Sequence, residues 1–291
     1  MEKQLNRRNF IGTGLTGAIA MNIGAASVAS AKKAKVKKTS CKIGLILYTL
    51  RDYLKTPDDI ARTLEKVKKI GYDCVEITSC EAVSPTELSK ILKQNELQAV
   101  SAHTGWGGIS GDIQAVVDQN KAIGNSHIVV SSMPGEFRNG EGYMKFAKLM
   151  SEAGVKLAEA GMTLGYHNHS FEFIKYNGRT GQEILITESD PKLFNFEIDT
   201  YWVQHGGADP ASFINQVAGR APTVHMKDMV MTDKGQVYAE VGEGNLNWPA
   251  ILKACKKAKS QYCIVEQDSC QRDPFESVAM SIRNMKSWGL S

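Results

Sequence analysis

The chain has 291 residues and a formal net charge of +4 at pH 7. Residues 1–31, for which we predict export and removal, carry three basic residues and one acidic residue, so the remainder has a net charge of +2. This small charge excludes nucleic acid from the expected partners, because the one basic cluster left, between Lys32 and Lys38, is interpreted as a solvated linker.

The first 31 residues have the layout of a secretory signal peptide. A charged start containing Arg7-Arg8 leads into a Gly- and Ala-rich apolar stretch that ends in the small residues Ala29-Ser30-Ala31. The arginine pair, followed by Phe10-Ile11, is typical of twin-arginine export signals. A retained membrane helix is the alternative, but the stretch is barely long enough to span about 30 Å and is diluted by polar residues. We therefore expect a periplasmic protein without a stable membrane anchor.

Residues 32–40 are predicted to be a basic linker, and residues 41–291 a single domain. No Pro-, Gly- or Ser-rich linker divides the latter range, and its length matches the usual size of one barrel domain. Export would permit disulfides among the six cysteines. None of them has the paired short spacing of a structural zinc site, so we interpret them mostly as small buried apolar side chains.

Along the domain, short apolar runs alternate with longer amphipathic segments. The predicted strands are residues 43–47, 74–77, 98–103, 127–131, 163–168, 194–199, 223–226 and 262–266. The predicted helices between them include residues 57–70, 85–95, 113–123, 142–160, 210–218 and 248–258, several of which begin with Pro and end at Gly. This alternation indicates a parallel sheet.

Eight strands are the number that a closed parallel barrel needs, so we predict an α/β fold of the (β/α)8 TIM barrel type. The alternative is an open doubly wound sheet. It is disfavoured because the first strand is followed by Tyr48-Thr49-Leu50-Arg51-Asp52, which is not a Gly-rich phosphate-binding turn.

Polar residues end most of the predicted strands, at the barrel end where active sites lie. A single His in such a place is more often structural than a ligand, but side chains that end different strands of one closed sheet converge on its axis. Crowded ionised carboxylates would repel one another and lose hydration unless a cation neutralised them. The sequence therefore predicts a divalent metal site among Glu76, His103, His167, Asn168, His169, Asp199, His225, Lys227, Glu266 and Asp268.

Carboxylate and imidazole ligands without thiolate suit manganese, cobalt, magnesium, iron or zinc. Geometry rather than ligand type would choose among these ions. Mn²⁺ is our first expectation, and one ion per chain is expected.

Four segments of the domain carry a resemblance to a known family. They are residues 164–173 (LGYHNHSFEF), 197–202 (EIDTYW), 224–228 (VHMKD) and 265–268 (VEQD), and Gly242-Glu243-Gly244 before Leu246 is similar to the loop between the last two ligand strands of that family. The domain resembles the xylose-isomerase-like barrels, which include sugar isomerases and epimerases, hydroxypyruvate isomerase, inosose dehydratase and endonuclease IV. The resemblance implies a metal-dependent isomerase or epimerase that abstracts a proton next to the carbonyl of a sugar or keto-sugar.

The resemblance also implies a set of metal ligands. In the epimerases of the family the metal is held by a Glu, an Asp, a His and a Glu on the fifth to eighth strands. Asp199, His225 and Glu266 match the last three. The fifth strand departs from the pattern, because His167 stands at the place of its Glu and Glu172 follows a few residues later. Either His167 replaces the missing ligand or Glu172 folds back to fill the place.

This departure bears on the mechanism, because in the epimerases the fifth-strand Glu is also one of two acid/base groups. Proton transfer across a ketose carbon requires groups on opposite faces of the substrate. We predict Glu266 and His167 as this pair, with Glu172 as the alternative to His167, and the metal as Lewis acid. Since a His/Glu pair is less symmetric than two Glu residues, a lyase or hydratase acting on keto-glycosides is the alternative to an epimerase.

Further side chains are predicted to bind the small-molecule sugar or keto-sugar. They include the strand-end residues Glu76, His103 and His169. Lys227 is expected either to polarise a substrate oxygen or to pair with Asp228. Trp106 and Trp202 are expected either to stack on a sugar ring or simply to pack.

Two other classes of function are weighed against this enzyme. A metal-dependent endonuclease is disfavoured by the export signal and by the lack of basic patches for phosphate contacts. A non-catalytic sugar-binding barrel is disfavoured by the presence of Asp199, His225 and Glu266. The sequence leaves open whether the protein forms a homo-oligomer.

Overall fold

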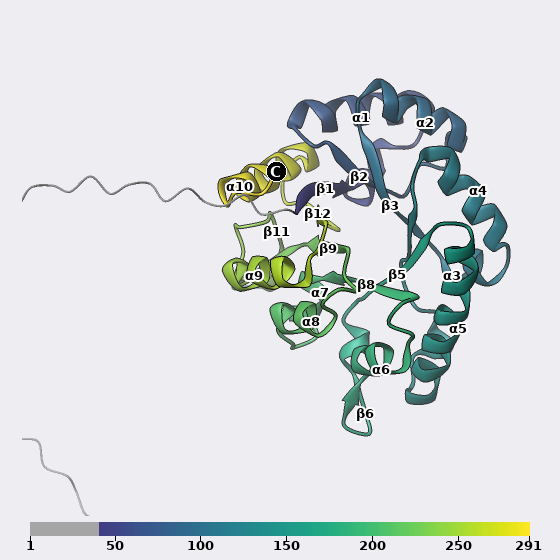
Figure 1. Ribbon diagram of the computed structural model, residues 1–291. Coiled ribbons are helices and arrows are strands. Elements are labelled where there is room, and N and C mark those ends of the chain that lie inside the picture. Colours follow the sequence, from purple (N-terminus) through teal and green to yellow (C-terminus); the bar gives the residue numbers. More distant parts are fainter. Residues whose placement is uncertain (1–40) are drawn as a thin grey trace, which may run out of the picture. The chain divides into compact units, whose positions relative to one another are not determined.

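The computed structural model describes residues 41–291, and the predicted signal peptide and linker lie outside the described residues. Eight parallel strands close into a barrel with helices around it (Figure 1). In order around the barrel these are β1 (Lys42–Ile46), β12 (Tyr262–Val265), β9 (Thr223–Met226), β8 (Phe194–Asp199), β5 (Thr163–His167), β4 (His127–Val130), β3 (Gln98–Thr104) and β2 (Cys74–Ile77). The predicted (β/α)8 TIM barrel is confirmed, and every predicted strand lies within one residue of its observed bounds.

The helices surround the barrel and cover the outer face of its sheet (Figure 1). Their bounds are α1 (Pro57–Ile70), α2 (Pro85–Gln94), α3 (Trp106–Ser110), α4 (Ile113–Ile123), α5 (Gly140–Glu159), α6 (Gly181–Glu188), α7 (Thr200–His205), α8 (Pro210–Gln216), α9 (Trp248–Ala258) and α10 (Pro274–Ser287). None of these helices is long and apolar enough to cross a membrane.

Local sequence explains where the helices begin and end. In α1 the Thr56 side chain accepts a hydrogen bond from the Asp59 amide, Pro57 occupies the first turn, and Gly71 ends the helix with φ of 111°. In α6 the side chains and amides of Thr180 and Glu183 bond reciprocally as a capping box. These signals use only neighbouring residues, and they were therefore readable from the sequence.

Alternate side chains of each strand face the two sides of the sheet. In β8, Phe194, Phe196 and Ile198 face outward into the main apolar core beneath the helices. Four strands of the barrel contribute to a second, small apolar cluster, which consists of Ile46, Cys74, Val100 and Ile264. Because other residues of these strands face outward into the main core, this cluster lies on the opposite face of the sheet, inside the barrel. Five of the six cysteines are buried and all six are unpaired.

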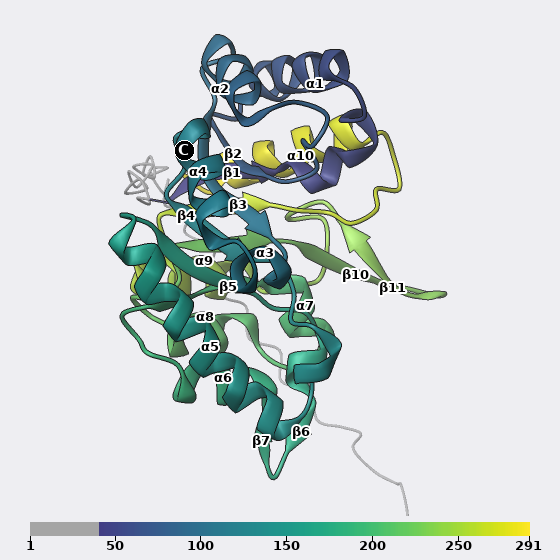
Figure 2. The ribbon, with the colours of Figure 1, turned by 90° about the vertical axis from the view of Figure 1, so that its right-hand side faces the viewer.

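Two hairpins, which we did not predict, extend the loops that follow barrel strands. The strands β10 (Asp228–Thr232) and β11 (Gly235–Ala239) pair antiparallel directly after β9 and project from the barrel (Figure 2). The second hairpin, β6 (Lys175–Tyr176) with β7 (Arg179–Thr180), lies between β5 and α6.

Candidate metal-binding site at the carboxyl ends of the barrel strands

Two acidic side chains come from β8. Glu197 and Asp199 are two residues apart, so both face the same side of the sheet, the inside of the barrel. Their neighbours Phe196 and Ile198 face the opposite side, into the apolar core beneath the helices. Both carboxylates are fully buried. We predicted Asp199 as a ligand but not Glu197, although the period of two that relates the two residues was the signal that could have found Glu197.

Strand β9 and its extension supply His225 and Lys227 in the same way. The hydroxyl of Thr200 donates to the carbonyl oxygens of both residues and accepts from the Lys227 amide, which fixes this segment against α7. Asp228 does not pair with Lys227. Its carboxylate accepts hydrogen bonds from the amides of Gly242, Gly244 and Leu246 and from the indole of Trp248, and so it anchors the loop before α9.

An irregularity in β3 turns His103 toward the inside. The register of β2 on β3 pairs Val75 with Ala99 and then Glu76 with Ser101, so that one extra residue, Val100, stands in β3. Without this bulge the alternation from Ala99 would direct His103 outward. The bulge instead places His103 on the same face as Glu76.

One group of four side chains, which we call the Asp199 group, consists of His167, Asp199, His225 and Glu266. One ligand atom from each residue lies within 4.8 Å of all the others, and all four residues are buried. His225 Nδ1 lies 2.7 Å from Glu266 Oε2 and 3.8 Å from Asp199 Oδ2. His167 Nε2 lies 3.3 Å from Asp199 Oδ2. The structure thus brings together four of the predicted ligands, of which His167, at the end of β5, is the member from the fifth barrel strand.

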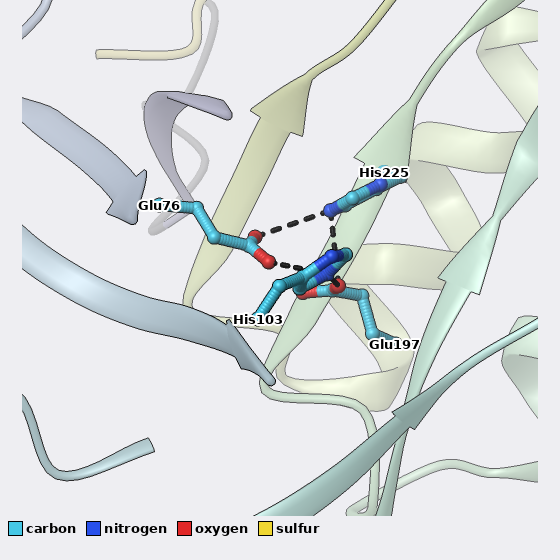
Figure 3. Close-up of side chains that lie close together, drawn as sticks. All are labelled: Glu76, His103, Glu197 and His225. Atoms are coloured by element: carbon cyan, nitrogen blue, oxygen red, sulfur yellow. Dashed lines mark hydrogen bonds and ion pairs between the residues drawn. The ribbon is translucent and has the colours of Figure 1, made fainter. Parts of the chain in front are cut away.

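A second group, the Glu197 group, consists of Glu76, His103, Glu197 and His225 and shares His225 with the first (Figure 3). His103 Nε2 lies 2.5 Å from Glu76 Oε1 and 2.7 Å from Glu197 Oε1. His225 Nε2 lies 3.1 Å from Glu76 Oε2 and 3.0 Å from Glu197 Oε1. Although burial lowers the pKa of His103, the carboxylates of Glu76 and Glu197 raise it to about 10.

Lys227 places a buried ammonium beside the Asp199 group. Its Nζ lies 2.6 Å from Asp268 Oδ2, 3.2 Å from Glu266 Oε2 and 3.5 Å from Asp199 Oδ2. Burial lowers the pKa of Lys227, but these carboxylates raise it above its usual value, so the amine stays charged. Burial also opposes ionisation of Glu266, yet Lys227 and His225 hold its pKa well below the usual range.

The donor set of the Asp199 group fits a divalent cation. The group offers two carboxylates and two imidazoles and no thiolate, which suits the first-row ions and magnesium. With neutral imidazoles, the ammonium of Lys227 balances only one of the three nearby carboxylates of Asp199, Glu266 and Asp268. Since the carboxylates of Asp199 and Glu266 are buried, the remaining negative charge favours a bound cation.

A cavity of about 370 Å³ opens above this group at the carboxyl ends of the strands. His167 and Glu266 reach its wall from the Asp199 group, and His103 reaches it from the Glu197 group. Burial lowers the pKa of His169, which also lines the cavity, to about 2, so this imidazole is neutral at ordinary pH. Trp202 and Asp268 complete the polar and aromatic lining.

His167 and Glu266 lie on the same side of this space. His167 Nε2 is 3.7 Å from Glu266 Oε2. The assignment of these two residues as the acid/base pair on a substrate stays a prediction. Both belong to the Asp199 group and contact each other directly.

Two predicted residues are not brought to the site. Glu172 is fully buried, but its carboxylate is bound by the Tyr166 hydroxyl at 2.5 Å and the His169 amide at 2.9 Å, outside both groups. Burial raises its pKa to about 7. Tyr166 faces the core beneath α5, and this keeps Glu172 from folding back toward the metal ligands.

Trp106 begins the short helix α3 and packs its ring against Phe137 and Phe146. It does not line the cavity, so its position does not support the expected stacking on a sugar. Trp202, by contrast, lies at the cavity wall, and its ring is 5.0 Å from Lys227 Nζ.

Comparisons with known proteins bear on both the fold and the site. Residues 64–288 match the family model described as xylose isomerase-like TIM barrel. No curated protein shows significant similarity to the chain.

Several solved structures share the fold. A sugar phosphate isomerase/epimerase from Parabacteroides distasonis superposes with a TM-score of 0.71 and 23% identity, over 90% of this chain and 98% of that one. A 3-keto-D-glucoside 4-epimerase from E. coli gives a TM-score of 0.62 and 17% identity, over 85% and 99% of the two chains. The IolI protein, solved with a bound zinc atom, gives 0.62 and 16%, over 85% and 98%. At these identities the likeness concerns the fold.

Proposed function

Because the chain belongs to the xylose isomerase-like TIM barrel family, we propose that it is a divalent-metal-dependent enzyme of the isomerase and epimerase kind, which abstracts a proton next to the carbonyl group of a sugar or keto-sugar. The observation that carries the proposal is the Asp199 group beside a cavity of about 370 Å³, whose wall includes His167 and Glu266 of that group, with Lys227 Nζ 3.2 Å from Glu266 Oε2. The isomerases and epimerases that share the fold support this class of reaction.

The metal would be held by Asp199, His225, Glu266 and His167. When bound, it supplies Lewis-acid polarisation of substrate oxygens. Its identity is proposed from the donor set alone: Mn²⁺ first, with Co²⁺, Mg²⁺, Fe²⁺ or Zn²⁺ as alternatives. The zinc atom of the IolI protein supports a cation site in a barrel of this fold.

Glu266 is the proposed base. It reaches the cavity wall, and its carboxylate stays ionised because Lys227 and His225 lower its pKa against the effect of burial. Lys227 remains an ammonium ion, and we propose that it stabilises the negative charge that develops on the substrate oxygen as the proton leaves. Neutral His169 and Trp202 bind the sugar at the wall of the cavity.

The contact between His167 and Glu266 favours a second candidate reaction. Because an imidazole and a carboxylate are less symmetric than two carboxylates, one-way chemistry is favoured over reversible transfer of a proton across a carbon. Elimination or hydration of a keto-glycoside is such a reaction. The 3-keto-D-glucoside 4-epimerase that shares the fold supports keto-glycosides as the substrate class.

Exchange in deuterated water tests the proposal directly. The metal-loaded protein, incubated with free ketoses and 3-keto-glycosides, should incorporate deuterium next to the carbonyl, as followed by NMR. An epimerase forms the labelled epimer, whereas a lyase releases the aglycone.

Two variants test the role of Glu266. Glu266→Gln should slow deuterium exchange at least about 100-fold. Glu172→Gln, a matched change outside the site, should keep the exchange rate within a few-fold of wild type. Sugar binding without exchange on any substrate would indicate a non-catalytic barrel instead.

A further inference from the structure

The Glu197 group contains buried negative charge that no permanent cation balances. Glu76 and Glu197 are fully buried, and within residues 41–291 their ion pairs are formed with imidazoles only. The Asp199 group differs, because Lys227 contacts two of its carboxylates. Burying ionised carboxylates is costly unless a positive charge lies against them.

Hydrogen bonding among these residues is also incomplete. A ring nitrogen carries at most one N–H, yet His103 Nε2 lies within 2.7 Å of oxygens from both Glu76 and Glu197. His225 Nε2 likewise faces both carboxylates at 3.0 and 3.1 Å. Glu197 Oε2 is buried and accepts no hydrogen bond from the described part of the chain. Two nitrogens and two carboxylates therefore point at one small space, with fewer protons available than oxygens that need them.

The two ring nitrogens of His225 face different groups. Nδ1 lies against Glu266 and Asp199, and Nε2 lies against Glu76 and Glu197. A neutral imidazole has a lone pair on only one nitrogen, but once its ring proton passes to solvent the imidazolate can offer one donor atom to each group at the same time. The two groups are otherwise made of different residues.

We propose that Glu76, His103, Glu197 and His225 form a second divalent-cation site, distinct from the Asp199 group, and that His225, as an imidazolate whose ring proton has passed to solvent, bridges the two ions when both are bound. One donor atom from each of the four residues lies within 4.8 Å of the others. Metal bonds of about 2.0–2.2 Å set neighbouring donors about 3.3–3.6 Å apart in a tetrahedron. The contacts of 2.5–3.1 Å between imidazole and carboxylate atoms in this group must therefore widen by about 1 Å or less to admit the ion. Two imidazoles with two carboxylates, the same donor set as in the Asp199 group, suit a first-row transition ion. Since His103 lines the cavity, the ion is accessible from the substrate side.

Metal content of the intact protein tests this site without any assay of activity. After loading with excess Co²⁺ or Zn²⁺ and desalting, elemental analysis should find two ions per wild-type chain. Glu197→Gln should retain one, and Asp199→Asn should also retain one. Glu172→Gln, the same change at a buried carboxyl outside both groups, should retain two. Circular dichroism on each variant establishes that it is folded.

His103→Gln provides a second variant at the edge of the group, where the side chain is 10% exposed and substitution perturbs packing least. It should also retain one ion. A wild-type content of one ion that Glu197→Gln and His103→Gln leave unchanged overturns the second site. If the metal content falls in Glu197→Gln but not in Asp199→Asn, the result supports the Glu197 group as a metal site. It would then show that the Asp199 group, on which the proposed function rests, holds no metal.

Electron paramagnetic resonance of the Mn²⁺-loaded protein tests the His225 bridge separately. Exchange-coupled Mn²⁺ signals would show that the two ions are neighbours, and isolated signals at two ions per chain would refute the bridge.

Discussion

Lys227 is a buried charge that three carboxylates hold in place. Removing it in Lys227→Met leaves those carboxylates without their ammonium partner, so the unfolding free energy of the metal-free protein should fall by about 3–5 kcal/mol. Bound metal replaces part of the lost positive charge, and the loss should then be smaller. Urea denaturation with and without the ion measures both values.

The matched control is Lys69→Met, because Lys69 pairs with Glu65 at the surface with its side chain 71% exposed. It should change stability by no more than about 1 kcal/mol, with or without metal. An equal loss for Lys227→Met in both conditions would mean that the ion does not compensate the same carboxylates.

Glu172 makes stability depend on pH in a direction opposite to that of most carboxyl groups. Burial raises its pKa from 4.5 to about 7, so the folded state favours the protonated form. Its contribution to stability is complete below pH 4.5 and is lost as the pH rises through about 7. The Glu172→Gln variant has no carboxyl to ionise, so it does not lose this stability as the pH rises. Its unfolding free energy minus that of the wild type should therefore increase between pH 4 and 8, by up to about 3 kcal/mol.

Glu183 supplies the opposite sign for comparison. Hydrogen bonds from the Thr180 amide and hydroxyl lower its pKa, so its contribution is present above its ordinary pKa and is lost in acid. Relative to wild type, Glu183→Gln should lose stability as the pH rises from 3 to 6. Thermal melting of both variants from pH 3 to 8 decides the signs, and a flat difference for Glu172→Gln would show that Glu172 is not a buried acid.

Among the elements, α5 is held close to the segment that leads into β8. A Cβ on Gly154 would lie 2.5 Å from the backbone oxygen of Leu193, a contact that flexible side chains cannot relieve. Gly154→Ala should therefore destabilise the protein by about 1–3 kcal/mol, although Ala is the better helix former. Because β8 carries Glu197 and Asp199, metal affinity should fall as well.

Gly107 in α3 is the matched control, since a Cβ there meets nothing within 4 Å. Gly107→Ala should be neutral or stabilising by up to about 1 kcal/mol. Chemical denaturation compares the two variants. If Gly154→Ala were as stable as wild type, the approach of α5 to β8 would be looser than the structure describes.

At the scale of the whole molecule, the proposed export concerns a segment outside the described residues. We propose that residues 1–31 are removed by cleavage after Ala31, on the basis of the arginine pair and the small residues before that point. N-terminal sequencing of protein from the periplasmic fraction should begin at Lys32. Replacing Arg7-Arg8 by two lysines should retain the protein in the cytoplasm, and periplasmic protein that still begins at Met1 would contradict the cleavage.

The sequence by itself determined the barrel and most of the candidate ligands. Strands and helices follow from periods of two and 3.6 and from caps formed by neighbouring residues, as in α1 with Thr56 and Gly71. A polar residue that ends a parallel strand must lie at the carboxyl end of the barrel. Asp199, His225 and Glu266 could therefore be assigned to one place without knowledge of their distances.

Only the tertiary structure decided which of these side chains meet. Glu76 and His225 are 149 residues apart, and their contact depends on strand register around the closed sheet, which local periodicity does not specify. The bulge at Val100 reverses the face of His103, and the Tyr166 hydroxyl holds Glu172 away from the ligands. Glu197, which the sequence analysis passed over, joins two histidines for the same reason: its partners come from other strands, and closure of the barrel alone brings them within bonding distance.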